Sequence, residues 1–134
     1  MKRYISVILA FVVFIVCAVS AYASASPCNA ITESKSCTLD ISSTTATCKS
    51  TFIDGTEITT RIKITQTLEK QGFLWTWSTY AGEWTKTTYG SSAALSNKVY
   101  NLESGKYRVK TVFSVTVDGD TTDYTVYSTE KTVG

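Results

Sequence analysis

The residue types that most often carry catalysis are sparse in this sequence of 134 residues, which contains no histidine. Histidine is the usual general base near neutral pH, the usual partner of a catalytic Ser or Cys, and the commonest zinc ligand. Asp118, Asp120 and Asp123 surround one expected turn, but the order D-G-D-T-T-D differs from a calcium-binding EF-hand loop. Glu83 beside Trp84 would suit sugar hydrolysis only with a second carboxylate, which the sequence does not identify. We therefore expect a protein that is not an enzyme, with no catalytic residue, no cofactor and no metal ion.

Aromatic residues are concentrated between positions 73 and 89. Exposed rings would stack on sugars or anchor a protein partner, whereas buried rings would fill the core. Phe73, Trp75 and Trp77 share one parity of an expected strand over 73–80, which favours burial. The remaining three, which flank glycine turns, are left open between core and surface, and we take them as tentative binding residues. They are Tyr80, Trp84 and Tyr89.

Cysteine usage predicts a disulfide in an exported domain. Cys37 and Cys48 lie on the inward parity of two short expected strands, and a turn at Ser42-Ser43 would place them opposite each other. We predict this bridge. A bridge from Cys28 to either of the other two, and three reduced thiols, are the alternatives.

The first 25 residues are typical of a cleaved signal peptide. Lys2 and Arg3 precede an apolar run over 4–19, and small residues suited to cleavage follow it. A retained membrane anchor is the alternative. Of the 13 Lys and Arg residues, these two lie in the signal, so cleavage leaves as many basic residues as the 11 acidic ones. No basic block remains, which argues against nucleic acid or an anionic membrane as partner. We expect a secreted protein, extracellular or cell-wall associated, with no membrane contact after cleavage.

The clearest strand signal lies at 104–117, reading S-G-K-Y-R-V-K-T-V-F-S-V-T-V. Polar and apolar residues alternate with a period of two, which predicts a strand with one wet face and one dry face. Asp118-Gly119-Asp120 predicts a tight hairpin turn at either of two positions, and a return strand follows over 121–129. In both registers Phe113 would share a face with Tyr124.

Further alternating segments complete an all-β prediction. They lie at 37–41, 44–53, 58–68, 73–80, 84–89 and 94–102, joined by short Gly, Asp and Ser turns. Seven or eight short antiparallel strands after a signal helix predict an immunoglobulin-like Greek-key sandwich, with a small closed barrel as the alternative. Tyr107, which follows Leu102 and Gly105, has the spacing of a tyrosine corner, and Val109 then stands where antibody domains carry a cysteine. The domain organisation is signal peptide 1–25, leader 26–36 and sandwich 37–134.

Several motifs also resemble a known family. They are A-T-C at 46–48, I-x-I-T-Q-T-L-x-K at 62–70, a Trp-rich segment, and S-G-K-Y-R-V-K-T-V-F-S-V at 104–115. This pattern, from Cys37 to about Tyr127, resembles a family of short secreted proteins from Gram-positive bacteria that has no assigned activity. The resemblance implies export and an immunoglobulin- or fibronectin-III-like β-sandwich, and it brings no catalytic residue.

Three functional hypotheses follow from these observations. The first is a binding module that uses Tyr80, Trp84 and Tyr89 on a cell-wall glycan or on a secreted or surface protein. The second is a small toxin or bacteriocin-like factor, which the size and export would suit. The third is a self-assembling surface protein, because Thr-rich edge strands can pair between chains.

Overall fold

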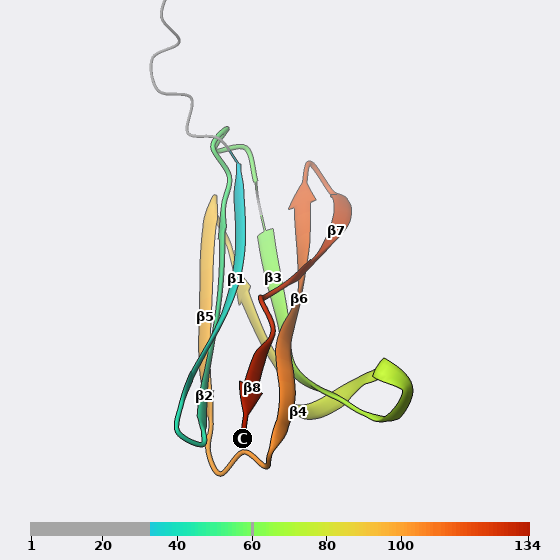
Figure 1. The fold of residues 1–134 in the computed structure, drawn as a ribbon. Helices are drawn as coiled ribbons and strands as arrows, with labels where there is room; N and C mark the ends of the chain where they lie inside the picture. Colours follow the sequence, from blue (N-terminus) through green and yellow to red (C-terminus); the bar gives the residue numbers. More distant parts are fainter. Residues whose placement is uncertain (1–32, 60) are drawn as a thin grey trace, which may run out of the picture.

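The computed structural model describes residues 33–59 and 61–134 of the chain (Figure 1). The expected signal peptide, Cys28 and most of the expected leader lie outside the described residues. Strand β1 begins at Ser34, three residues before the expected domain boundary at Cys37. The described elements are β1 (Ser34–Ser42), β2 (Thr45–Ile53), β3 (Arg61–Gln71), the 3-10 helix η1 (Phe73–Trp75), β4 (Trp77–Thr88), β5 (Ser92–Val99), β6 (Gly105–Val117), β7 (Asp120–Tyr127) and β8 (Lys131–Val133).

These strands form two antiparallel sheets, which lie as two layers in Figure 1. One sheet has the order β1-β2-β5 and the other the order β4-β3-β6-β7, with β8 also paired to β6. The all-β prediction and the strand count are confirmed. Both sheets are open in the described part of the chain, so the alternative of a closed barrel is wrong.

The hairpin of β6 and β7 has one of the two predicted registers. Val117 pairs with Asp120, so the turn consists of Asp118 and Gly119, whose φ angles are 50° and 91°. Two positive φ values define the type I′ turn that Asp-Gly favours, because its twist matches that of the flanking strands. Phe113 lies opposite Tyr124, and both pack in one hydrophobic cluster. The predicted dry face is therefore confirmed.

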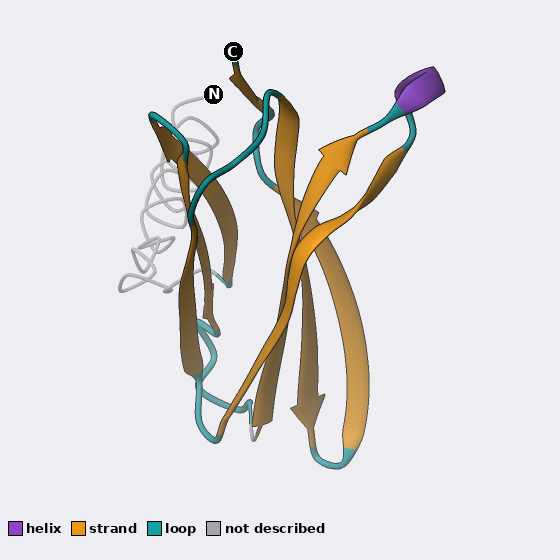
Figure 2. Cartoon of the chain, turned by 90° about the horizontal axis from the view of Figure 1, so that it is seen from below, coloured by secondary structure: helices purple, strands orange, loops and turns teal. Residues whose placement is uncertain are grey.

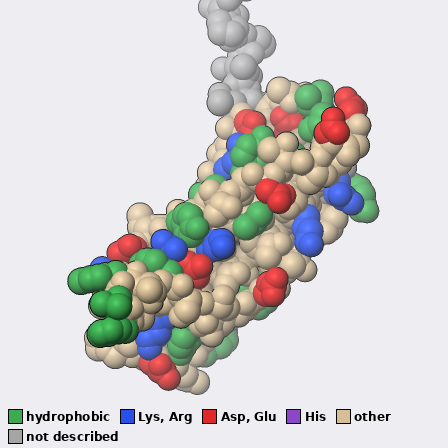
Figure 3. Space-filling model, turned by 90° about the vertical axis from the view of Figure 1, so that its right-hand side faces the viewer, with side chains coloured by type: hydrophobic (Ala, Val, Ile, Leu, Met, Phe, Trp, Pro, Cys, Tyr) green, Lys and Arg blue, Asp and Glu red, His purple; other side chains and the backbone are tan. Residues whose placement is uncertain are grey.

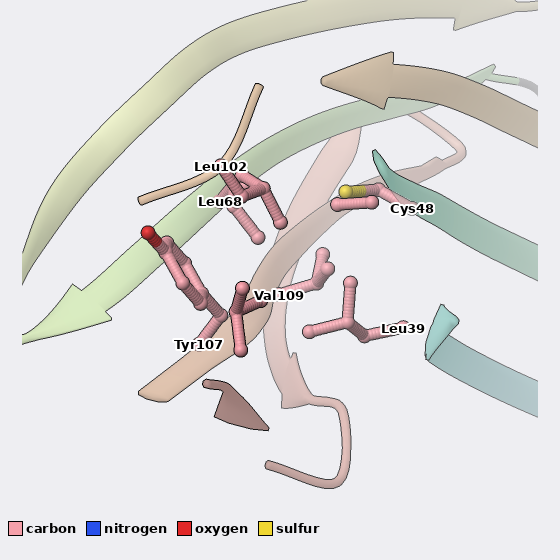
Figure 4. Packing of buried hydrophobic residues seen from close by; sticks show 8 residues of the cluster. Leu39, Cys48, Leu68, Leu102, Tyr107 and Val109 are labelled. Carbon is pink, nitrogen blue, oxygen red and sulfur yellow. The ribbon is translucent and has the colours of Figure 1, made fainter. Parts of the chain in front are cut away.

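The space between the sheets contains two hydrophobic clusters. The first lies near the start of β6 and is centred on Tyr107, Val109 and Leu68, all fully buried (Figure 4). The second lies farther along the strands, where the Phe52 and Phe113 rings pack 5.8 Å apart. Burial of these side chains is the main stabilising contribution in a domain of this size.

A chain of polar side chains crosses the core beside these two clusters. Gln66, fully buried on β3, donates from Nε2 to Ser50 Oγ at 2.6 Å and accepts from Asn97 Nδ2 at 2.8 Å. The Ser50 hydroxyl is hydrogen-bonded to that of Thr111 at 2.7 Å, and Cys37 Sγ lies 3.2 Å from the same Thr111 oxygen. Because every member has a partner, this chain can be buried without the cost of an orphaned polar group.

The tyrosine corner has the hydrogen bond that its sequence spacing predicts. Tyr107 is fully buried, and its hydroxyl donates to the backbone oxygen of Glu103 at 2.7 Å. Leu102, just upstream, is buried in the same cluster, and its N–H donates to Thr44 O in the β1–β2 turn at 2.9 Å. These contacts hold the crossing from β5 to β6 against the core.

The two described cysteines are free thiols, so the predicted disulfide is not seen. The β1–β2 turn lies at Ser43-Thr44, one residue later than expected, and this shifts the register by two residues. Cys37 therefore pairs with Ser50 and Cys48 with Leu39, which leaves the two sulfurs diagonal instead of opposite. Burial raises the pKa of Cys37, and it raises that of the fully buried Cys48 to about 12. The alternative bridges from Cys28 lie outside the described residues.

Candidate functional site

The three tentative binding residues do not form one exposed patch. Tyr80 and Trp84 are half-buried against the first cluster, and the Tyr80 ring meets the Tyr107 ring edge-on at 5.1 Å. Tyr89 lies beyond the end of β4, where 79% of its surface is exposed. Eight residues lie between it and Tyr80, and nine steps of extended chain span about 30 Å. Tyr80 and Trp84 therefore pack against the core, and Tyr89 lies too far away to share a surface with Tyr80.

Trp84 lies beside an irregularity in β4, at the glycine where the sequence predicts a turn between strands over 73–80 and 84–89. Ala81-Gly82 lies inside the continuous strand β4, at a point where the pairing with β3 shifts register. Gly82 has φ 78°, and a Cβ built on it would approach the Trp84 ring to 2.3 Å. Only glycine allows this close approach. The bulge thus turns a candidate binding ring onto the edge of the core.

The exposed apolar site lies instead at the turn between β3 and β4. A strand with a buried parity is predicted over 73–80; the strand begins only at Trp77, so the prediction is confirmed for 77–80 and wrong for the residues before it. Phe73, Leu74 and Trp75 form the 3-10 turn η1, and their side chains are 86%, 72% and 77% exposed. Figure 2 shows this turn at the end of two strands that splay away from the rest of the molecule. We name these three residues the hairpin tip.

Backbone hydrogen bonds close the hairpin tip in an unusual conformation. Gly72 N donates to Thr76 O at 2.7 Å, and the Thr76 hydroxyl donates to Phe73 O at 2.8 Å. Leu74 and Trp75 have φ angles of 56° and 62°, in the left-handed region. This region costs an L-residue about 1–2 kcal/mol, so the turn displays large apolar side chains at a cost in stability.

An aromatic and charged stack lies directly behind the hairpin tip. The Arg108 guanidinium carbon is 4.2 Å from the ring centroid of Trp77 and 4.2 Å from that of Tyr127. Arg108 Nε also donates to Glu69 Oε2 at 2.7 Å. Cation–π contacts with two rings and an ion pair hold this arginine in place. These four residues, on four strands of one sheet, form what we call the arginine stack.

A second ion pair lies on the core side of the same end. Lys70 Nζ lies 2.8 Å from Glu103 Oε2, and this hydrogen bond raises the pKa of Lys70 and lowers that of Glu103. The Lys70 ammonium also lies 5.5 Å from the Tyr80 ring and 5.7 Å from the Tyr107 ring. Burial raises the pKa of the Tyr107 hydroxyl. Phenol and ammonium therefore both keep their protons at neutral pH, and the pair braces the tyrosine corner.

The carboxylates that sequence reasoning considered lie elsewhere. Asp118, Asp120 and Asp123 surround the β6–β7 turn, at the end of β6 opposite to the hairpin tip. Glu83 is exposed on the bulge of β4. Among residues 33–59 and 61–134, no group of three or more His, Cys, Asp or Glu side chains is placed to hold a metal ion. In the same ranges no helix is long and apolar enough to cross a membrane.

One signal in the sequence could have identified the hairpin tip. Alternation stops at Gln71-Gly72, and three large apolar residues then follow without interruption. A strand with one wet face would not place Leu74 between Phe73 and Trp75. Such a run directly after a break is better explained by a turn than by a core strand.

Comparisons with known proteins identify no family for this chain. No family model, no curated protein and no solved structure matches it.

Proposed function

We propose that this chain is a secreted, non-enzymatic binding protein that contacts its partner with the hairpin tip. The supporting observation is the high exposure of Phe73, Leu74 and Trp75 on a turn held in a costly backbone conformation. An exposed apolar patch on a soluble domain commonly marks an interaction site. A fold gains nothing from displaying three such residues, so selection for contact explains them better.

Export and the absence of catalysis are part of this proposal. Export rests on the signal-like residues 1–25, with their charged start and apolar run. The non-enzymatic assignment rests on the lack of histidine throughout the chain. The resemblance to short secreted proteins of Gram-positive bacteria points in the same direction.

We also propose that the domain is immunoglobulin-like, closest to the fibronectin-III arrangement. One sheet contains β1, β2 and β5, and the other contains β3, β6 and β7. This division is the one found in immunoglobulin sandwiches, except that β4 here joins the second sheet. The Tyr107 hydrogen bond supports the same assignment. In such sandwiches, function is commonly carried by the loops and hairpins at the ends of the strands.

The test compares the purified protein with a variant whose tip is polar. Fluorescently labelled wild type, F73S/L74S/W75S and Y89S are incubated with intact Gram-positive cells and with isolated wall glycan, and the bound fraction is measured. Tyr89 is a matched control because it is 79% exposed and lies at the other end of β4. We expect the triple variant to lose at least tenfold in binding and Y89S to bind like wild type. Equal binding of all three would refute the proposal.

The other hypotheses predict different outcomes of the same experiment. A toxin-like factor would inhibit the growth of the cells to which it binds. A self-assembling surface protein would sediment as oligomers with no cells present. If the triple variant inhibited growth or formed oligomers as well as wild type does, the function would not depend on the hairpin tip.

A further inference from the structure

We propose that the hairpin tip inserts into the interfacial region of a lipid bilayer. This inference rests on the proposed function and names its partner. The hairpin tip would enter the bilayer first. The arginine stack behind it would then lie at the level of the lipid headgroups.

The shape of the hairpin tip favours a bilayer over a pocket in another protein. None of its three residues is buried, and consecutive residues around so tight a turn point in different directions. The apolar side chains therefore project outward from the end of the hairpin, and hydrophobic side chains gather at the lower left edge of the face seen in Figure 3. A rigid partner would need a deep socket for such a knob, whereas a fluid bilayer adapts to it.

The side chains behind the hairpin tip suit the headgroup layer. Tryptophan and tyrosine are enriched at membrane interfaces, because their rings are apolar and carry one polar group. Trp77 is half-buried, Tyr127 is 47% exposed, and Arg108 lies between their rings. The guanidinium is a donor that pairs well with phosphate. The guanidinium of Arg108 and the rings of Trp77 and Tyr127 therefore lie just behind the hairpin tip.

Charge at this end of the molecule is compatible with lipid phosphates. The register places Lys106 one residue beyond the last β3–β6 pair, level with Gln71, two residues before the hairpin tip. Lys106 is paired with Glu130, as Lys70 is with Glu103. Lys131, next to this pair, has no carboxylate partner among the described residues. Acidic and basic side chains are thus nearly balanced at this end, and each of Glu69, Glu103 and Glu130 is paired with a base.

This inference departs from the expectation of no membrane contact, which was based on net charge alone. A neutral mature chain is not drawn to an anionic surface by electrostatics. Insertion of apolar side chains does not require that attraction. We therefore expect binding to zwitterionic vesicles, with little dependence on salt.

Three side chains would give weak and reversible binding. One myristoyl chain gives an association constant of about 10⁴ M⁻¹, and the hairpin tip should be in this range or below it. Half of the protein would then be bound at roughly 0.1 mM accessible lipid or above. Residence on a membrane would be transient unless another signal added to it.

The test uses the purified protein with vesicles of phosphatidylcholine, alone or mixed with phosphatidylglycerol. Sedimentation measures binding, and quenching of tryptophan emission by brominated lipid measures insertion. We expect wild type and Y89S to bind alike and F73S/L74S/W75S to bind at least tenfold more weakly. W75F should bind like wild type but lose most of the quenching, because Trp77 and Trp84 lie behind the tip and are half-buried.

Failure of this inference is distinguishable from failure of the proposed function. Tip-dependent binding to cells with no binding to vesicles at millimolar lipid would refute the bilayer and keep the binding site. If protease treatment of the cells also abolished that binding, the partner would be a protein. No tip-dependent binding to cells or vesicles would refute both proposals. Equal vesicle binding by wild type and the triple variant would place the membrane contact elsewhere.

Discussion

The hairpin tip and the tyrosine corner lie at the same end of the molecule and are both rich in aromatic residues, but their surroundings are opposite. Tyr107 is fully buried, hydrogen-bonded and in contact with a second ring. Phe73 and Trp75 are 86% and 77% exposed. The tyrosine corner stabilises the core, whereas the hairpin tip exposes apolar side chains to solvent. Aromatic density in a sequence therefore does not distinguish a core from a binding site.

The difference arises from where each segment lies relative to the second sheet. Tyr107 pairs with Lys70, the last β3 residue that β6 covers. Beyond this residue β3 and β4 form one more pair, Gln71 with Trp77, and the turn follows. This turn packs against nothing that could bury it, as Figure 2 shows. Equally hydrophobic side chains are thus buried or exposed depending on whether they lie a few residues before or after the point where the neighbouring strand ends.

The largest effect is expected at the tyrosine corner. Y107A should lower the free energy of unfolding by about 3–5 kcal/mol, because it removes a ring from a packed cluster. Y107F should cost about 1 kcal/mol, since it removes only the hydrogen bond to Glu103. Urea unfolding followed by fluorescence measures both values. A Y107A protein as stable as wild type would show that the corner does not support the core.

A smaller loss of stability is expected for substitutions in the buried hydrogen-bonded side chains beside the two clusters. Q66A should cost about 2–3 kcal/mol, because it leaves a cavity and removes the hydrogen-bond partner of Ser50. S50A/Q66L/T111V replaces the three buried members together and should cost less than Q66A alone. Thermal unfolding of the two variants decides the point. The opposite order would mean that packing, and not hydrogen bonding, sets the cost.

A pH-dependent effect is expected at Asp54, in the loop after β2. Its carboxylate accepts hydrogen bonds from the N–H and hydroxyl groups of Thr56 and Thr59, which hold the pKa of Asp54 well below its usual value. A lowered folded-state pKa contributes stability that is full above the unfolded value of 3.8 and is lost as pH falls through the folded value. D54N should cost about 1–2 kcal/mol at neutral pH and reduce the acid dependence of stability. Unfolding curves between neutral pH and pH 2 measure this, and an unchanged dependence would contradict it.

The smallest effect on stability, and the sharpest contrast with the corner, is expected at the hairpin tip. L74G should gain up to about 1 kcal/mol, because glycine adopts the left-handed conformation without penalty and Leu74 buries little. Its binding to cells or vesicles should fall at the same time. F73G is the matched control, since Phe73 is outside the left-handed region and glycine there should not stabilise. A destabilised L74G would show that the tip packs in solution.

Several features of the fold followed from local sequence alone. Alternation over 104–117 and the Asp-Gly pair set the β6–β7 hairpin and its dry face. The spacing from Leu102 to Tyr107 predicted a hydrogen bond that the structure contains. These predictions succeeded because parity and turn chemistry act between residues that are close in the chain.

Only the tertiary structure decided which side chains each segment buries and which it exposes. A turn one residue later separated Cys37 from Cys48, and the bulge at Gly82 folded Trp84 inward. The length of the β3–β4 hairpin placed Phe73 and Trp75 beyond the reach of the core. Each outcome depends on where a strand turns, bulges or ends relative to its neighbours, and side-chain alternation along one strand carries no information about these positions.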